Sequence, residues 1–275
     1  MIRINECCLW KGSVIGFAYH IFHREEVLEL KGKKALVTGG AIRMGKAICE
    51  SLAAAGCHIA IQYRESQSDA NKLVEALSAR GVQATALQAD LNDMQQVGAL
   101  VAEAQQRLGG LDILVNNAAV FHKTTLLASD PDVVQAELGV NALAPIELMR
   151  VFGRLHESEH TDSWPEAAIV NILDRRIAGV EKGAFPYALS KNMLRDATQM
   201  AARELGPAVH VNGVAPGPIL PPPGKGEDYL SERAGPMVLA LRPAPRDVAK
   251  AVLFLLQADG ITGQVIYVDS GQHLL

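Results

Sequence analysis

The sequence predicts a single doubly wound parallel α/β sheet of about seven strands, with helices on both faces. From Lys33 onward, short runs rich in Val, Ile, Leu and Ala alternate with amphipathic segments of helix length. Continuous apolar runs are typical of strands that are covered on both faces. Their regular alternation with helices favours one parallel sheet with right-handed crossovers. Gly56, Gly81, Gly109 and Gly206 stand where helices are expected to end.

The order of these segments defines one domain over residues 31–275. Residues 1–30 are expected to lie outside it, either as an amphipathic arm or as the product of a start codon placed too far upstream. The expected strands are 35–38, 57–62, 83–88, 113–115, 168–173, 209–214 and 264–268. The expected helices are 44–55, 69–80, 94–108, 131–155, 186–205 and 246–257.

The proline-rich segment 216–226 cannot continue a central strand, because proline lacks the N–H donor that a strand needs. It follows the sixth expected strand at its carboxyl end, which is where ligands bind in open α/β sheets. We therefore expect residues 216–245 to form a mobile lid; a surface loop without function is the alternative.

The composition argues against several classes of protein function. The chain has 275 residues, 49% of them hydrophobic, and a formal net charge of -4, which argues against a nucleic-acid-binding surface. The longest uncharged run near the start, 12–22, is too short to span a bilayer, so no membrane partner is expected. Cys7, Cys8, Cys49 and Cys57 show no C-x-x-C spacing, which predicts neither a metal site nor disulfides and favours a cytoplasmic location.

A glycine-rich turn follows the first expected strand, with the sequence TGGAIRMG over residues 38–45. Such a turn between a strand and a helix lets backbone N–H groups approach a pyrophosphate, which the start of the helix then holds. Gly39, Arg43, Met44 and Gly45 are the candidate cofactor contacts here. A tight turn of purely structural purpose is the alternative.

The end of the second expected strand indicates which dinucleotide is bound. An enzyme that uses NAD tends to place an acidic residue there, whereas the 2′-phosphate of NADP requires cations. Tyr63 is followed by Arg64 and Ser66, which offer a cation and a hydroxyl, and Arg43 is a second cation. Glu65 is expected to face solvent. NADPH is therefore the predicted cofactor.

Two further strand ends carry candidate cofactor contacts. Asp90 and Leu91 follow the third strand, where a carboxylate can accept a hydrogen bond from the adenine amino group. Asn117, Ala118 and Ala119 end the fourth strand, and their small size would let a flat ring approach the backbone. Asp and Asn are also common as helix caps, so each signal alone is weak.

Tyr187 and Lys191 stand four residues apart in an expected helix, which places both on one face. An ammonium beside a phenol favours the phenolate, so Lys191 is expected to lower the pKa of Tyr187 from about 10 toward neutrality. Alone, such a pair is more often a surface contact than a catalytic one.

Together, these motifs resemble the short-chain dehydrogenase/reductase family over residues 33–275, in the family's order and with its Rossmann-type fold. The resemblance implies that Tyr187 is the proton donor, that Lys191 binds the nicotinamide ribose, and that Asn141 holds a water chain. It also implies cofactor contacts from Pro216, Gly217 and Ile219, and a homotetramer.

Two departures from the general family pattern match one of its branches. Arg43 replaces a glycine of the turn, and Asp174, 13 residues before Tyr187, replaces the usual serine. Both are similar to pteridine reductases and to bacterial dihydromonapterin and dihydrofolate reductases of this fold. The resemblance implies NADPH-dependent reduction of a pterin or folate-like substrate. The implied substrate contacts are Arg43, Phe121, Asp174, Tyr187 and Leu220.

The charge state of Asp174 is left open by the sequence. An ionised aspartate cannot donate a hydrogen bond, and it disfavours ionisation of the neighbouring tyrosine. It can act if a partly apolar pocket keeps it protonated, if it passes protons to Tyr187, or if it accepts from an N–H donor. Pterins have ring nitrogens that need protonating and simple ketones do not, which favours a nitrogen heterocycle as the substrate. Arg175 or Arg176 could keep it ionised, or meet an anionic substrate tail; in an extended chain only one would reach the pocket.

Three functions remain in competition. The leading hypothesis is pterin reduction, although Ala119 replaces a serine that is frequent in that branch. A carbonyl reductase of the same fold, acting on a 3-oxoacyl thioester or a sugar, is the nearest alternative. A catalytically silent NADPH-binding protein is the third, and the presence of Asn141, Tyr187 and Lys191 argues against it.

Overall fold

A computed structural model of the protein describes residues 29–157, 167–179, 181–222 and 224–275. Within them, seven parallel strands form one sheet in the order β3-β2-β1-β4-β5-β6-β7, which confirms the predicted fold class. The strands are β1 (Lys34–Val37), β2 (His58–Tyr63), β3 (Ala84–Gln88), β4 (Ile113–Asn116), β5 (Ala167–Ile172), β6 (Val209–Pro216) and β7 (Val265–Val268).

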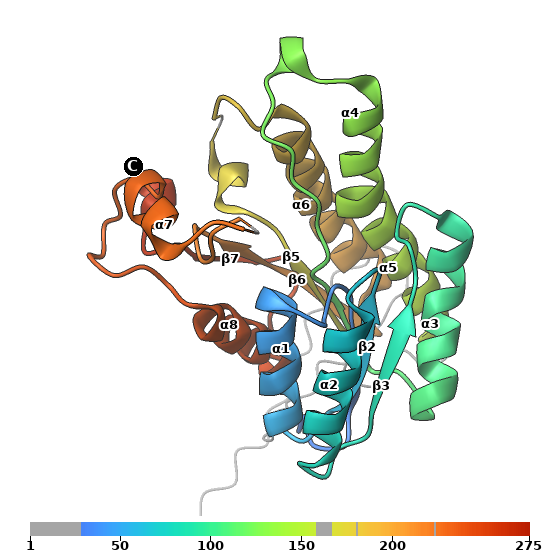
Figure 1. Cartoon of the computed structure of the whole chain (residues 1–275). Coiled ribbons are helices and arrows are strands. Elements are labelled where there is room, and N and C mark those ends of the chain that lie inside the picture. The colour runs from blue at the N-terminus through green and yellow to red at the C-terminus, as the bar shows by residue number, and fades with distance from the viewer. Residues whose placement is uncertain (1–28, 158–166, 180, 223) are drawn as a thin grey trace, which may run out of the picture.

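Helices cover both faces of this sheet (Figure 1). They are α1 (Arg43–Ala54), α2 (Gln67–Ser78), α3 (Met94–Leu108), α4 (Pro131–Leu138), α5 (Ala144–Leu155), α6 (Phe185–Leu205), α7 (Glu227–Arg233) and α8 (Pro245–Gln257). Helices α1, α2 and α8 share one hydrophobic core, and α3, α5 and α6 share the other. The central strands are buried because each faces a core on both sides, as their continuous apolar runs indicate.

The strand order fixes where a ligand can bind. Strand β1 pairs with β2 on one side and with β4 on the other, so the chain adds β2 and β3 on one side of β1 and β4 to β7 on the other. A crevice opens at such a switch point, outside the carboxyl ends of the strands. The glycine turn after β1, the end of β2 and the segment after β4 therefore meet at one edge of the sheet.

Three elements differ from the prediction. The expected helix 131–155 is interrupted by one π-helical turn, Gly139–Leu143. The sequence does not predict this turn, because the apolar spacing continues through it. Helix α7 lies within the expected lid, where its short, polar sequence gave no helical signal. The strand β6 also continues to Pro216, whose missing donor is tolerated at the last strand position.

Leu30, the second of the described residues, is buried in the core, and its carbonyl oxygen accepts from the thiol of Cys57. The expected extension over residues 1–30 lies outside the described residues, apart from its last two. In the parts that are described, no helix is long and apolar enough to cross a membrane. Both described cysteines, Cys49 and Cys57, are buried free thiols.

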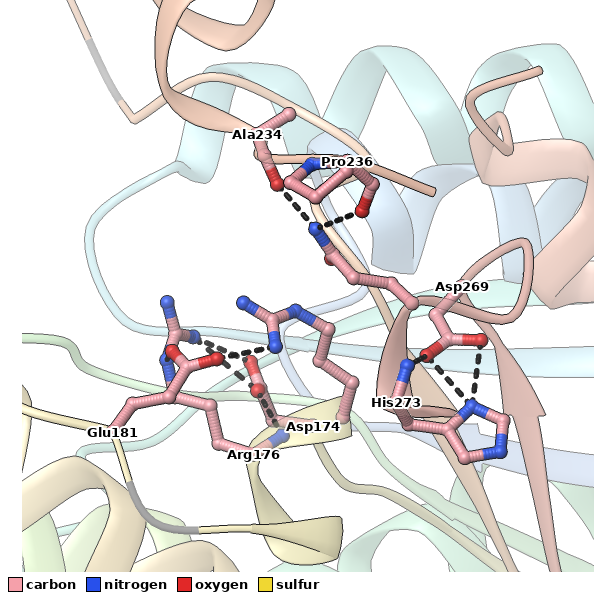
Figure 2. Close-up of polar contacts among 9 residues, drawn as sticks. Asp174, Arg176, Glu181, Ala234, Pro236, Asp269 and His273 are labelled. Carbon is pink, nitrogen blue, oxygen red and sulfur yellow. Dashed lines mark hydrogen bonds and ion pairs between the residues drawn. The ribbon is translucent and has the colours of Figure 1, made fainter. Parts of the chain in front are cut away.

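The C-terminal segment forms hydrogen bonds with part of the region expected to form a lid. Gln272 donates hydrogen bonds to the carbonyl oxygens of Ala234 and Pro236, and the backbone of Leu239 donates to Ser270 at 3.0 Å. Asp269 in turn accepts from His273 (Figure 2). Residues 234–241 are thus held against the C-terminus at the carboxyl end of the sheet.

Candidate active site

The glycine turn is closely packed at its start. Gly39 has a φ of +59°, and a Cβ there would lie 3.0 Å from the Cα of Ala118. A Cβ at Gly45 would overlap the carbonyl oxygen of Gly39 and lie 2.7 Å from the side-chain nitrogen of Asn117. Only glycine lets the first turn of α1 approach the loop this closely, which leaves the helix start open to an anion.

Side chains that the sequence did not mark as site residues hold this turn. The side chain of Gln62 accepts from the backbone N–H of Gly39 at 2.8 Å and donates to Ala89 at 2.8 Å. The Thr38 hydroxyl accepts from the backbone of Asn117 at 2.9 Å. Gln62 could have been found from its sequence, since it is a buried polar residue in the otherwise apolar strand β2.

Eight of the seventeen predicted cofactor residues line one pocket beside this turn. Its volume is about 240 Å³, and Arg64 and Ser66 lie at it. Glu65 is 78% exposed, as expected, but it also lies at the rim of this pocket, where it pairs with Arg64 at 2.8 Å. The glycine turn, a cation and a hydroxyl make this pocket fit the phosphorylated adenosine end of a dinucleotide. The predicted residues that line it are Gly39, Tyr63, Arg64, Ser66, Asp90, Leu91, Ala118 and Ala119.

Asn117 acts on the turn rather than lining the pocket. Its side-chain nitrogen donates to the carbonyl oxygens of Thr38 at 2.8 Å and Gly39 at 3.2 Å. Met44 likewise packs against the hydrophobic core rather than lining that pocket.

Arg43 adopts an unusual backbone conformation. Its φ of +55° lies in the left-handed region, which fits a position where the general family pattern has glycine. The cost for a non-glycine residue is roughly 1–2 kcal/mol. Its guanidinium reaches across to the proline-rich segment and donates to the carbonyl oxygen of Pro221 at 2.6 Å. Arg43 therefore connects the glycine turn with the expected lid.

The segment after β6 crosses the same edge of the sheet. Gly217 donates to Val268 at 3.0 Å, and a Cβ at Gly217 would lie 2.8 Å from the Cβ of Asp269. Ile219 is buried in the core, and Leu220 packs against it. Leu220, a predicted substrate contact, thus directs its side chain at least partly toward the core.

Tyr187 and Lys191 both project from α6, as their spacing predicts. The Tyr187 hydroxyl donates to Asp174 at 3.3 Å. The ammonium of Lys191 is buried, donates to the carbonyl oxygen of Ile172 at 2.7 Å, and lies 5.8 Å from the centre of the Tyr187 ring. Burial lowers the pKa of Lys191 to about 8, although the negative charge of Asp174 acts to raise it.

The expected lowering of the tyrosine pKa is not found among the protein's own groups. Burial raises the pKa of the Tyr187 phenol well above its ordinary value. The charge of Asp174 also raises this pKa, and the charge of Arg176 lowers it. The expectation, which considered the charge of Lys191 alone, is wrong because desolvation of the phenol and the charge of Asp174 both penalise the phenolate. These groups hold the proton on Tyr187.

Asp174 is paired with Arg176 (Figure 2). Its carboxylate accepts from the Arg176 backbone at 2.9 Å and from the guanidinium at 3.2 Å. Residues Arg175–Ala178 form a 3-10 turn rather than the extended chain considered above. The turn brings both arginines to Glu181, while Arg176 also reaches Asp174.

Phe121 lies against the catalytic candidates. Its ring meets that of Tyr187 edge to face, with 4.9 Å between centres and an angle of 89°. The guanidinium of Arg176 lies 5.8 Å above the Phe121 ring. Phe121 is also 45% exposed.

Asn141 lies in the π-helical turn and binds the segment before Phe121. Its side chain accepts from the backbone of Val120 at 2.8 Å and donates back at 2.9 Å. The expected role of holding a water chain is not tested by these contacts. One turn earlier, the fully buried Glu137 accepts from both the backbone and the ring of His122.

A family model described as enoyl-(acyl carrier protein) reductase matches residues 40–273. The chain belongs to the short-chain dehydrogenase/reductase family. Pteridine reductase 1 of Leishmania tarentolae is 33% identical, over 87% of this chain and 96% of its own. The 3-oxoacyl-[acyl-carrier-protein] reductase FabG of Staphylococcus aureus is 32% identical, over 88% and 98%.

Among solved structures, FolM alternative dihydrofolate reductase 1 from Brucella canis, complexed with NADP, has a TM-score of 0.80 at 33% identity. It covers 90% of this chain and 96% of its own. Together with pteridine reductase 1, it supports the predicted pteridine reductase branch of the short-chain family. The NADP in that complex agrees with the predicted cofactor.

Proposed function

We propose that this short-chain reductase uses NADPH to reduce a pterin-type substrate such as dihydromonapterin, dihydrobiopterin or dihydrofolate. The observation that carries the proposal is the Asp174 carboxylate, hydrogen-bonded to Tyr187 and paired with Arg176. An ion-paired carboxylate accepts from N–H groups, and the pterin ring offers them, whereas a 3-oxoacyl chain does not.

The cofactor would be held by the pocket around Gly39, Arg64 and Ser66, with Lys191 beside its ribose. When bound, NADPH supplies the hydride. Tyr187 keeps its proton because burial and Asp174 oppose ionisation, so it is in the correct state to protonate a ring nitrogen of the substrate. Phe121 is 45% exposed and would supply an aromatic contact for a flat heterocycle.

Arg176 maintains the acceptor character of Asp174. It supplies two guanidinium contacts and one backbone contact to the carboxylate, and these contacts offset the cost of burying a negative charge beside a phenol. Asp174 can then orient an N–H group of the substrate while the neighbouring Tyr187 donates the proton.

The second candidate is a 3-oxoacyl-thioester reductase. It is favoured by the FabG relative, which matches the chain at nearly the same identity as pteridine reductase 1. Asp174 opposes it, because a ketone needs a hydrogen-bond donor at the position where this chain has a paired carboxylate.

One assay separates these functions. Purified protein is offered NADPH with dihydromonapterin, dihydrobiopterin, dihydrofolate or an acetoacetyl thioester, and NADPH consumption is followed. We expect turnover with at least one pterin. Turnover of the thioester alone would refute the proposal, and tight NADPH binding without any turnover would support a silent protein. Asp174→Ser should impair pterin reduction; unchanged pterin activity would show that the aspartate has another role.

We also propose that the protein is a homotetramer, as the family resemblance implies. Phe185, Leu189, Met193 and Met200 are exposed and follow one stripe of α6, and Leu143 is exposed in the π-helical turn. An apolar stripe of this kind favours association. Light scattering after size exclusion should give the tetramer mass, and Leu189→Glu should give smaller species.

A further inference from the structure

Two arginines beside the substrate position share one internal carboxylate. Glu181 binds the guanidinium of Arg175 through one oxygen and that of Arg176 through the other, the latter at 3.0 Å (Figure 2). Arg176 also contacts Asp174 and lies over Phe121. The cluster therefore adjoins the residues proposed to bind the heterocycle.

The charges of this cluster balance. Arg175 and Arg176 supply two positive charges, and Asp174 and Glu181 supply two negative ones. Although partial burial acts to raise it, hydrogen bonds and charges from both arginines leave the pKa of Glu181 below its ordinary value, so the carboxylate stays ionised at neutral pH. Arginine guanidiniums bind carboxylates well, and here each of the two already contacts one oxygen of Glu181.

We propose that Glu181 determines substrate specificity by taking the place that a substrate carboxylate would take against Arg175 and Arg176. This inference rests on the proposed pterin reductase function. The enzyme should therefore favour pterins with uncharged side chains over folates, whose glutamate tail is anionic. Without Glu181 the cluster would carry one uncompensated positive charge, which would attract such a tail.

The test compares kcat/KM for dihydrofolate with kcat/KM for dihydromonapterin. Glu181→Gln keeps the shape of the side chain and removes its charge. We expect the ratio of the two values to rise about ten-fold in favour of dihydrofolate, equivalent to about 1.4 kcal/mol, mainly through a lower KM. Glu103→Gln is the matched control, because Glu103 pairs with Arg107 on α3, away from the site; its ratio should equal that of the wild type.

A double variant identifies the cation that is freed. In Arg175→Gln/Glu181→Gln the charge balance is restored without the internal carboxylate, so the gain for dihydrofolate should disappear. A gain that persists in the double variant would refute the role of Arg175, and an unchanged ratio in Glu181→Gln would refute that of Glu181. Melting temperatures of the variants identify any that are unfolded.

A measurement of folate binding tests this inference separately from the proposed function. Calorimetric titration of the enzyme–NADPH complex with folate should show tighter binding to Glu181→Gln than to the wild type. Equal folate affinity overturns the specificity role even if dihydromonapterin is reduced. Absence of pterin turnover in the wild type overturns the proposed function, while tighter folate binding by Glu181→Gln would still support the carboxylate competition.

Discussion

Gly45 is the position where the packing of the cofactor site can be tested most directly. A Cβ there would overlap the Gly39 carbonyl oxygen and lie 2.8 Å from its carbon. Because these are backbone atoms, the glycine turn and α1 must separate when Gly45→Ala is introduced. Overpacking of this kind costs about 1–3 kcal/mol, against a helix-propensity gain of about 1 kcal/mol for alanine.

Gly98→Ala provides the matched control. Gly98 lies inside α3, and a Cβ there would meet only a side-chain oxygen of Glu147 at 3.8 Å, an ordinary contact. It should therefore gain up to about 1 kcal/mol in stability. Because both variants share the helix-propensity gain, they should differ by roughly 1–3 kcal/mol in the free energy of unfolding, which is the cost of the clash at Gly45.

The assay has two readouts. Urea unfolding followed by circular dichroism gives the stability difference, and NADPH fluorescence gives the dissociation constant. We expect Gly45→Ala to weaken NADPH binding at least about ten-fold, equivalent to about 1.4 kcal/mol, and Gly98→Ala to leave it unchanged. If Gly45→Ala is as stable as Gly98→Ala and binds NADPH equally well, the close approach of α1 to the turn is wrong.

Three further variants test the site. Tyr187→Phe keeps the ring contact with Phe121 and should lower kcat about 10²–10⁴-fold with little change in melting temperature; retention of activity would exclude Tyr187 as the acid. Arg64→Ala should raise the dissociation constant of NADPH about ten-fold and leave NADH unaffected; an equal loss for both would contradict a 2′-phosphate contact. Burial lowers the pKa of Lys191 to about 8 from 10.5, so the unfolded chain binds a proton that the native state lacks between these pH values. The stability of the wild type relative to Lys191→Met should therefore rise by on the order of 3 kcal/mol from pH 8 to 10.5; urea unfolding that shows no such rise would place Lys191 in a wetter environment.

The fold could be predicted from the sequence because its strands are covered on both faces. Strands such as β5 are continuous apolar runs, and the observed bounds lie within one or two residues of those expected. The π-helical turn at Gly139–Leu143 could not be predicted, since the apolar spacing continues across it. Helix α7 has few apolar residues and no capping side chain, so local sequence does not mark it.

The sequence predicted which residues form the candidate site better than it predicted their pKa values. A fixed spacing in an expected helix places Tyr187 and Lys191 together, and strand ends place Asp90 and Ala118 at one edge. The pKa of Tyr187 depends instead on burial and on distances between separate elements, which the sequence does not contain. Gln62 illustrates the same limit, because its partners Gly39 and Ala89 become neighbours only when the strands pair.

The replacement of serine by Asp174 is best understood together with Arg176 and Glu181. A lone carboxylate half-buried beside a phenol would be costly, and Arg176 offsets that cost through three hydrogen bonds. Arg176 and Arg175 in turn require Glu181 to balance their charges. Removing Asp174 alone therefore leaves an extra positive charge beside Tyr187, which favours its phenolate. The loss of activity in Asp174→Ser would then combine the missing acceptor with a changed proton donor, and only Asp174→Ser with Arg176→Gln separates the two effects.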